Sequence, residues 1–180
     1  MTSLDLNYRA KLWSREQAKQ TIEPMLADVD LLVGNEEDAH HVLGISAAAT
    51  DVTQGRVEHA AYESVARQIQ EKYGCRYVAI TLRESESATV NHWSGCLLAQ
   101  GKFHLSRRYS IHVVDRVGAG DAFCGGLVCG LLEQRPMQES LEFAVAASCL
   151  KHSIVGDFNK VTRDEVERLA GGDASGRVQR

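Results

Sequence analysis

The stretch from His112 to Leu132, HVVDRVGAGDAFCGGLVCGLL, constrains the fold more than any other part of this sequence. A β-branched run leads into a glycine-rich turn, and an apolar helix follows the turn. Gly118 and Gly120 allow positive φ angles and a close approach of another group to the backbone. The free N–H groups at the start of the helix, together with the positive end of its dipole, predict an anion site.

Asp121 stands directly beside this predicted anion site. A carboxylate next to a bound phosphate is unfavourable unless it has a task, and accepting the proton of a hydroxyl that attacks a phosphoryl group is such a task. Gly118, Ala119 and Gly120 would then supply the amides that stabilise the transferred charge, and Asp121 would be the general base. The same residues can also form an ordinary loop in which Asp121 only caps the helix. The motif by itself leaves both interpretations open.

The rest of the chain alternates helical and strand periods. Capping boxes at Ser14 and Thr162 predict the starts of two helices, and Pro24 interrupts or restarts the first. Apolar periodicity predicts further helices over 35–44, 57–74, 120–132 and 137–152, and strands over 29–34, 76–82, 87–93, 96–100 and 102–105. A loop of small residues is expected over 47–53. This pattern predicts an α/β layered domain with a mainly parallel sheet and an antiparallel hairpin region in its middle.

Composition narrows the class of protein. The chain has 180 residues, of which 44% are hydrophobic, and this is enough for a substantial core. A net charge of -4 without a basic stripe argues against nucleic-acid binding. No apolar run approaches the roughly 20 residues that a membrane span needs, and the start lacks a signal-peptide pattern, so we expect a cytoplasmic protein. The scattered cysteines predict free thiols rather than disulfides or a metal site: Cys75, Cys96, Cys124, Cys129 and Cys149.

The sequence DRVGAGD, residues 115–121, resembles the signature Asp-Thr-x-Gly-Ala-Gly-Asp of the ribokinase-like carbohydrate kinases, also called the phosphofructokinase-B family. Arg116 replaces the usual Thr, and this version is similar to that of the 2-keto-3-deoxygluconate kinases within the family. The resemblance extends from about residue 4 to residue 169. It implies a ribokinase-like layered α/β/α fold and ATP-dependent transfer to the 6-hydroxyl of 2-keto-3-deoxygluconate, with ATP and Mg as cofactors.

Two more stretches support the resemblance on the substrate side. LDLNYRAKLWS is similar to the segment in which these kinases place an Arg against the sugar-acid carboxylate, which implies Arg9 as the clamp and Asn7 as its neighbour. A guanidinium suits a carboxylate because two parallel hydrogen bonds fix its orientation. CLKHSIVGDFN is similar to the C-terminal segment of these kinases and implies Asp157 as a contact to substrate hydroxyls. Arg116 would be a second cation near the sugar acid.

Nucleotide and magnesium contacts are implied in the same way. VGNEEDAHHVLG resembles the Asn-x-x-Glu element that helps to arrange Mg and phosphate, which implies Asn35 and, with Asp in the place of the usual Glu, Asp38. An acidic helix start would produce a similar pattern. ITLRES falls where relatives place nucleotide-contacting residues and implies Thr81 and Arg83, although the Lys-x-Gly form common in relatives is absent.

Kinases of this family have roughly twice this domain size, so the resemblance implies a C-terminal portion of a kinase domain over 1–170, incomplete on its N-terminal side, with a flexible tail over 171–180. The expected partners are a small-molecule sugar acid and either a second copy of the chain or a missing N-terminal half. Two alternatives remain open: a non-catalytic nucleotide-binding or subunit-interaction protein, and a kinase for a neutral sugar such as fructose or ribose. Arg9 and Arg116 favour an acidic substrate over a neutral one.

Overall fold

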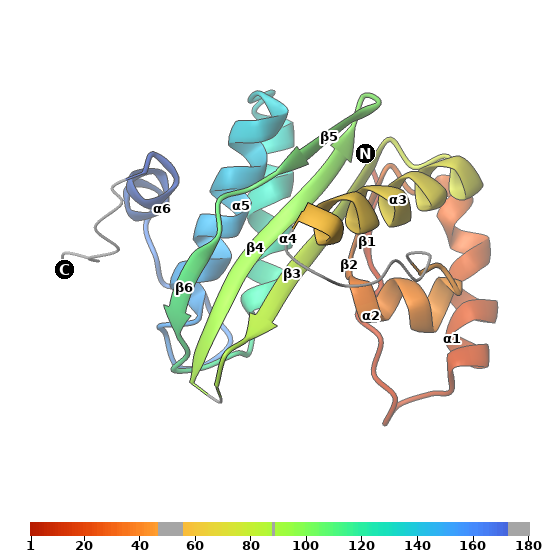
Figure 1. Cartoon of the computed structure of the whole chain (residues 1–180), viewed down its shortest axis with the longest axis horizontal. Helices are drawn as coiled ribbons and strands as arrows, with labels where there is room; N and C mark the ends of the chain where they lie inside the picture. Colours follow the sequence, from red (N-terminus) through yellow and green to blue (C-terminus); the bar gives the residue numbers. More distant parts are fainter. Residues whose placement is uncertain (47–55, 88, 173–180) are drawn as a thin grey trace. The chain divides into compact units, whose positions relative to one another are not determined.

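The computed structural model describes residues 1–46, 56–87 and 89–172. The chain separates into two compact units. Unit 1 comprises Met1–Leu82 and Cys96–His104, and unit 2 comprises Arg83–Gly95 and Leu105–Arg180. The strands are hydrogen-bonded in the order β1-β2-β3-β4-β5, and β6 pairs with β4 (Figure 1). The residues predicted as a small-residue loop and most of those predicted as a tail lie outside the described residues.

The first three strands of the sheet run parallel to one another. β1 (Ser3–Asp5) pairs with β2 (Leu31–Asn35), and β2 pairs with β3 (Tyr77–Ser85), so that Leu32 stands between Leu4 and Val78 in the register. The first three residues of β2 are buried, as expected for a parallel strand that is covered on both faces. The predicted parallel part of the sheet is therefore confirmed.

Local signals set the first helix of unit 1. Ser14 and Gln17 form both hydrogen bonds of a capping box, and α1 (Arg15–Ile22) begins at the next residue after Ser14. Pro24 stands in the first turn of the 3₁₀ helix Glu23–Asp28, where a missing N–H costs nothing. The predicted interruption at this proline is confirmed as a change of helix type.

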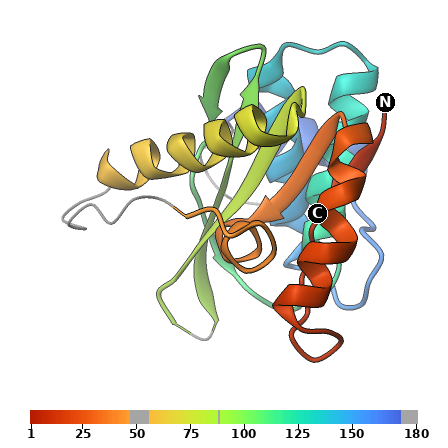
Figure 2. The same ribbon diagram turned by 90° about the vertical axis from the view of Figure 1, so that its right-hand side faces the viewer.

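The remaining helices of unit 1 follow β2 and precede β3. The short helix α2 (Glu36–Asp38) continues into a π-helix over Ala39–Leu43, which ends at Gly44 in the left-handed region. Figures 1 and 2 both show this segment beside α1. Helix α3 (Arg56–Tyr73) ends before Gly74, whose φ of +75° suits glycine.

Unit 2 contains an antiparallel strand pair and three helices. The first half of β4 (Val90–Ala99) pairs antiparallel with β6 (Tyr109–His112). Helices α4 (Ala119–Leu132) and α5 (Met137–Lys151) lie side by side in both views (Figures 1 and 2). Two glycines of α4 make this close packing possible, because added Cβ atoms would stand 2.9 Å from Ala144 Cα at Gly126 and 2.7 Å from Ser140 Oγ at Gly130.

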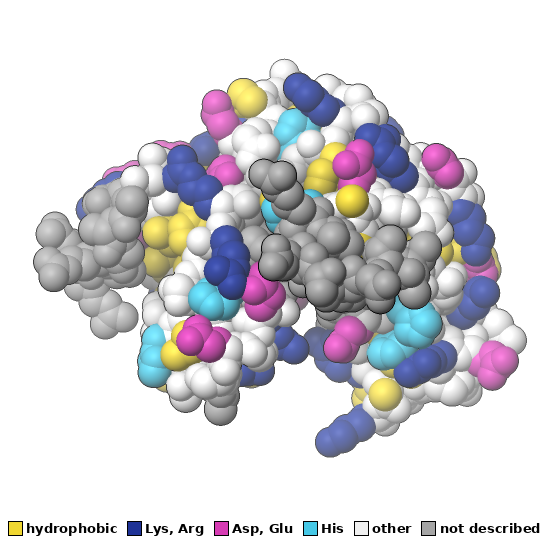
Figure 3. Space-filling view, in the orientation of Figure 1, with side chains coloured by type: hydrophobic (Ala, Val, Ile, Leu, Met, Phe, Trp, Pro, Cys, Tyr) yellow, Lys and Arg dark blue, Asp and Glu magenta, His cyan; other side chains and the backbone are white. Residues whose placement is uncertain are grey.

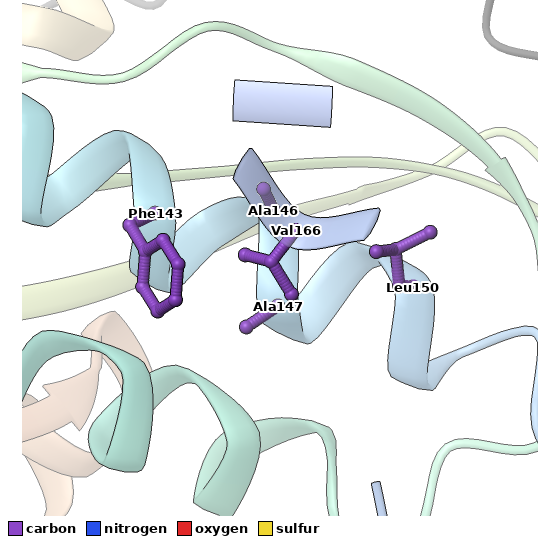
Figure 4. Packing of buried hydrophobic residues seen from close by; sticks show 5 residues of the cluster. All are labelled: Phe143, Ala146, Ala147, Leu150 and Val166. Atoms are coloured by element: carbon purple, nitrogen blue, oxygen red, sulfur yellow. The ribbon is translucent and has the colours of Figure 1, made fainter. Parts of the chain in front are cut away.

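Helix α6 (Arg163–Ala170) begins with the predicted capping box between Thr162 and Glu165. It packs on α5 through a cluster of buried side chains, which Figure 4 shows from close by. Val166 of α6 is 3% exposed. Its α5 partners lie on one side of that helix: Phe143, Ala146, Ala147 and Leu150.

One part of the predicted strand pattern is wrong. The stretches 87–93 and 96–100 were expected to form two strands, but Val90–Ala99 is a single strand, β4. Ser94 and Gly95 continue the strand because both backbone groups of Gly95 form hydrogen bonds with Ser106. The Gly95 N–H donates to Ser106 Oγ at 3.0 Å, and the Gly95 carbonyl accepts the Ser106 N–H at 2.9 Å. The partner strand β5 (Lys102–Leu105) was predicted correctly.

The surface charge is mixed in sign (Figure 3), and the cysteines are free thiols. On the face drawn in Figure 3, Lys and Arg side chains alternate with Asp and Glu side chains rather than forming one basic patch. Within the described residues, no helix is long and apolar enough to cross a membrane. All five cysteines are free, and burial raises the pKa of Cys96 and of Cys149 to about 12, so these two thiols are weakly reactive.

Candidate active site

The glycine turn at the start of α4 is built around Gly118. This residue is the N-cap of the helix and has a φ of +75°, a conformation that favours glycine. A Cβ at this position would collide with the carbonyl oxygen of Asp157. Glycine is therefore required here both by the backbone angle and by the approach of the segment after α5.

Asp115 joins the turn to that segment. Its Oδ1 accepts the Val117 N–H at 3.0 Å, and its Oδ2 accepts the Gly156 N–H at 2.8 Å. These two hydrogen bonds, helped by the charge of Lys151, hold the pKa of the Asp115 carboxyl below its usual value. An ionised Asp115 thus fixes both segments, a structural role that the sequence motif alone does not reveal.

The first turn of α4 is open to an anion. In the described part of the chain no side chain caps this helix, and the Ala119 N–H makes a long hydrogen bond of 3.4 Å to the Arg116 carbonyl. The helix dipole directs partial positive charge to the same place. Asp121, the third residue of the helix, is exposed. A helix start without a side-chain cap and a solvent-accessible carboxylate therefore lie within one helical turn.

In unit 1, Asn35 and Asp38 form a reciprocal pair at the start of α2. Asn35 Oδ1 accepts the Asp38 N–H at 2.8 Å, and Asp38 Oδ2 accepts the Asn35 N–H at 3.4 Å. This is the geometry of a capping box. Asp38 is 5% exposed, and its burial raises the pKa of the carboxyl despite the hydrogen bonds that lower it. The predicted role of these two residues toward Mg and phosphate stays a prediction.

Asp38 also reaches the segment that contains Arg9. Its Oδ1 accepts the Tyr8 N–H at 3.2 Å. Next to this contact, Asn7 has a φ of +38°, which is uncommon outside glycine, and its N–H donates to Asp5 Oδ1. The Arg9 side chain is exposed and donates to the Tyr8 carbonyl at 2.9 Å. The structure thus brings together Asn7, Arg9 and Asp38 around one turn of unit 1.

A model of the family described as pfkB family carbohydrate kinase matches residues 1–171 of the chain. The chain belongs to the pfkB family of carbohydrate kinases. Carbohydrate kinases of this family use ATP, typically with Mg. The family confirms the resemblance drawn from residues 115–121.

Individual pfkB relatives agree. The crystal structure of 2-dehydro-3-deoxygluconokinase from Thermotoga maritima is 49% identical, with a TM-score of 0.87 over 94% of this chain and 50% of that chain. A pfkB family carbohydrate kinase from Listeria grayi is 34% identical, with a TM-score of 0.81 over 94% of this chain and 49% of that chain. The 2-dehydro-3-deoxygalactonokinase of Haloferax volcanii is 33% identical over 96% of this chain and 48% of its own. The chain thus spans about half the length of the relatives it matches.

Within this pfkB chain, Arg116 is held by β4. The Asn91 side chain is fully buried, and the orientation that satisfies its amide lets Oδ1 accept from Arg116 Nη2 at 3.2 Å while the nitrogen donates to Ser85 Oγ and the Val90 carbonyl. Sequence reasoning missed Asn91. Its signal was an amide between Val90 and Trp93 in a predicted strand.

Thr81 and Arg83, the two residues implied as nucleotide contacts, lie on β3. Thr81 Oγ1 donates to the Gly34 carbonyl at 3.5 Å within unit 1. Arg83 is exposed in unit 2. Burial lowers the pKa of His152, and the positive charges of Lys151, Arg116 and Arg83 lower it further. Arg83 therefore belongs to a group of positive charges around the end of α5.

The residues fit a nucleotide better than a protein-bound metal cage. At Gly120 a Cβ would meet nothing within 4 Å, so the start of the helix is open to a phosphate oxygen. Within the described residues, no group of three or more His, Cys, Asp or Glu side chains could hold a metal ion. Mg usually keeps several waters and binds through one or two carboxylates together with substrate phosphates. A magnesium ion at this place would therefore be held chiefly by the phosphates of the nucleotide and by water.

Proposed function

We propose that this chain belongs to an ATP-dependent kinase that phosphorylates 2-keto-3-deoxygluconate at its 6-hydroxyl. The observation that supports this most is the uncapped start of α4, where a Cβ at Gly120 would meet nothing within 4 Å and Asp121 is exposed within the same turn. The substrate class is supported by the two relatives named as 2-dehydro-3-deoxy sugar-acid kinases.

In the proposed reaction, the Asp121 carboxylate accepts the proton of the sugar hydroxyl, and the resulting oxygen attacks the γ-phosphorus of ATP. The bond between the γ-phosphorus and the bridging oxygen breaks, and ADP leaves with the electron pair on that oxygen. Backbone N–H groups of the turn, Gly118 to Gly120, stabilise the charge on the transferred group. When bound, Mg neutralises part of the phosphate charge.

Arg9 is the proposed contact for the carboxylate of the sugar acid. Its exposed guanidinium sits on a turn fixed by Asp38 and by the strained backbone of Asn7, so its base is held while its tip stays accessible. Asp157 is the proposed contact for substrate hydroxyls, because its side chain is exposed while its carbonyl is fixed against Gly118.

The test is ADP release by the chain with Mg, ATP and 2-keto-3-deoxygluconate, beside its galactonate epimer, fructose and ribose. Turnover confined to the sugar acids supports the proposal, and a preference for fructose or ribose would contradict the substrate class. ADP binding without turnover on any sugar would favour a non-catalytic nucleotide-binding protein. Arg9→Lys should raise KM for the sugar acid, since Lys cannot make the bidentate contact.

A further inference from the structure

Lys151, at the end of α5, is a fully buried charged residue that the proposed reaction does not use. Its Nζ donates to the carbonyl of Ile154 at 2.9 Å. In the part of the chain that the structure describes, it forms no salt bridge with a carboxylate. Lysine is almost never fully buried unless it is paired. The position of this ammonium therefore needs a reason beyond filling space.

The side chain lies against the glycine turn. Lys151 Cε stands 3.3 Å from the position that a Cβ of Gly118 would take, and the carbonyl oxygen of Asp157 lies closer still to that position. The charge also acts on Asp115, the carboxylate that ties the turn to the segment after α5. Lys151 thus bonds to the segment after α5 through the Ile154 carbonyl, lies beside Gly118 of the turn and acts on Asp115 through its charge.

Stability does not explain a lysine at this place. Removing an ammonium from water is expensive, and replacing buried charges by apolar side chains of similar volume is often neutral or stabilising. A methionine of the same length would fill the space without that cost. Near an anion site the charge has a use, because in a poorly hydrated environment it acts strongly on a nearby phosphate.

We propose that Lys151 is a positioning residue, a fixed internal cation that holds the turn 115–118 against the segment 154–157 and adds positive potential to the anion site. The inference deepens the proposed phosphoryl-transfer function and rests on it. Lys151 acts through the turn and through its field, and the amides of the turn remain the groups that meet the phosphate.

The test compares Lys151→Met with Lys160→Met, which removes an exposed lysine from the same unit. We expect Lys151→Met to keep or raise Tm, to weaken the binding of MgADP and of tripolyphosphate by roughly 10-fold or more, and to speed hydrogen exchange of the amides in residues 115–121. Lys160→Met should change none of these. In Lys151→Ala, added methylammonium should restore part of the anion affinity, which a purely structural loss would not allow.

The outcomes separate the two proposals. Unchanged anion affinity and unchanged exchange in Lys151→Met would overturn the role of Lys151. If the unaltered chain binds neither MgADP nor tripolyphosphate, the proposed function is overturned instead. The exchange rates of the turn then still decide whether Lys151 positions it.

Discussion

Ser148 donates a 2.7 Å hydrogen bond from its Oγ to the carbonyl oxygen of Ala119, and both atoms are buried. Ser148 lies in the last turn of α5, and Ala119 is the first residue of α4. The start of α4, with its glycine turn, is therefore anchored on α5 by a side chain as well as by helix packing. A change in how the two helices fit together should reach the turn.

The glycines of α4 test this packing. Gly126→Ala and Gly130→Ala each place a methyl group too close to atoms of α5. We expect each substitution to lower the free energy of unfolding by roughly 1–3 kcal/mol. Gly125→Ala is the matched control, because its Cβ would meet nothing within 4 Å. Because alanine has a higher helix propensity than glycine, Gly125→Ala should raise the free energy of unfolding by about 0.5–1 kcal/mol. Urea unfolding measures all three, and equal effects would contradict the packing argument.

Asp121→Asn tests the general base. The variant retains the size of the side chain but cannot accept a proton, so we expect turnover to fall roughly 100-fold or more while ADP affinity stays nearly unchanged. Asp164→Asn alters a carboxylate in the first turn of another helix, α6, and should leave turnover intact. Steady-state kinetics and calorimetric titration with MgADP give the two readouts. Normal turnover in Asp121→Asn would overturn the role of Asp121 as the base.

Stability should depend on pH through Glu133. Hydrogen bonds from Arg163 and then Arg135 lower the pKa of the Glu133 carboxyl from 4.5 to about 2. The native state therefore releases this proton more readily than the unfolded chain, and the stabilisation is complete above about pH 4.5 and is lost as the pH falls through about 2.

The measurement is urea unfolding of the unaltered chain and of Glu133→Gln between pH 7 and pH 2.5. The difference between them should be largest at neutral pH, shrink on acidification and shrink in 1 M salt, because these side chains are exposed. Glu71→Gln, on the exposed side of α3, is the control. A difference as large at pH 2.5 as at pH 7 would point to a role for Glu133 other than its charge.

Local signals predicted the helices because their causes are local. The capping boxes at Ser14 and Thr162 need only residues three positions apart, and both are confirmed. Pro24 acts through its own missing N–H. The glycine turn was predicted for the same reason, since the positive φ angle of Gly118 favours glycine whatever surrounds the turn.

Contacts between distant segments could not be predicted in this way. The single strand β4 depends on Ser106, eleven residues after Gly95, which supplies the hydrogen bonds that carry the strand through a small residue. In the sequence, Lys151 stands at the end of a predicted helix, where the helix dipole favours a basic side chain in any case. Its burial under Gly118 follows from how α4, α5 and the following segment come together.

Asp38→Asn separates a positioning role from a magnesium role. Both oxygens of Asp38 accept backbone N–H groups, from Tyr8 and from Asn35, so the carboxylate ties the turn that carries Arg9 to the start of α2. An amide in its place would direct an NH₂ group at one of these donors, and the turn should loosen. We expect KM for the sugar acid to rise by about 10-fold, as for the loss of a hydrogen bond to a charged group, with the dependence of turnover on Mg unchanged.

The control is Glu37→Gln, one residue earlier and exposed, which should alter neither KM for the sugar acid nor the dependence on Mg. A shift in the Mg concentration needed for half-maximal turnover, with KM for the sugar acid unchanged, would show that Asp38 acts through the metal rather than through Tyr8.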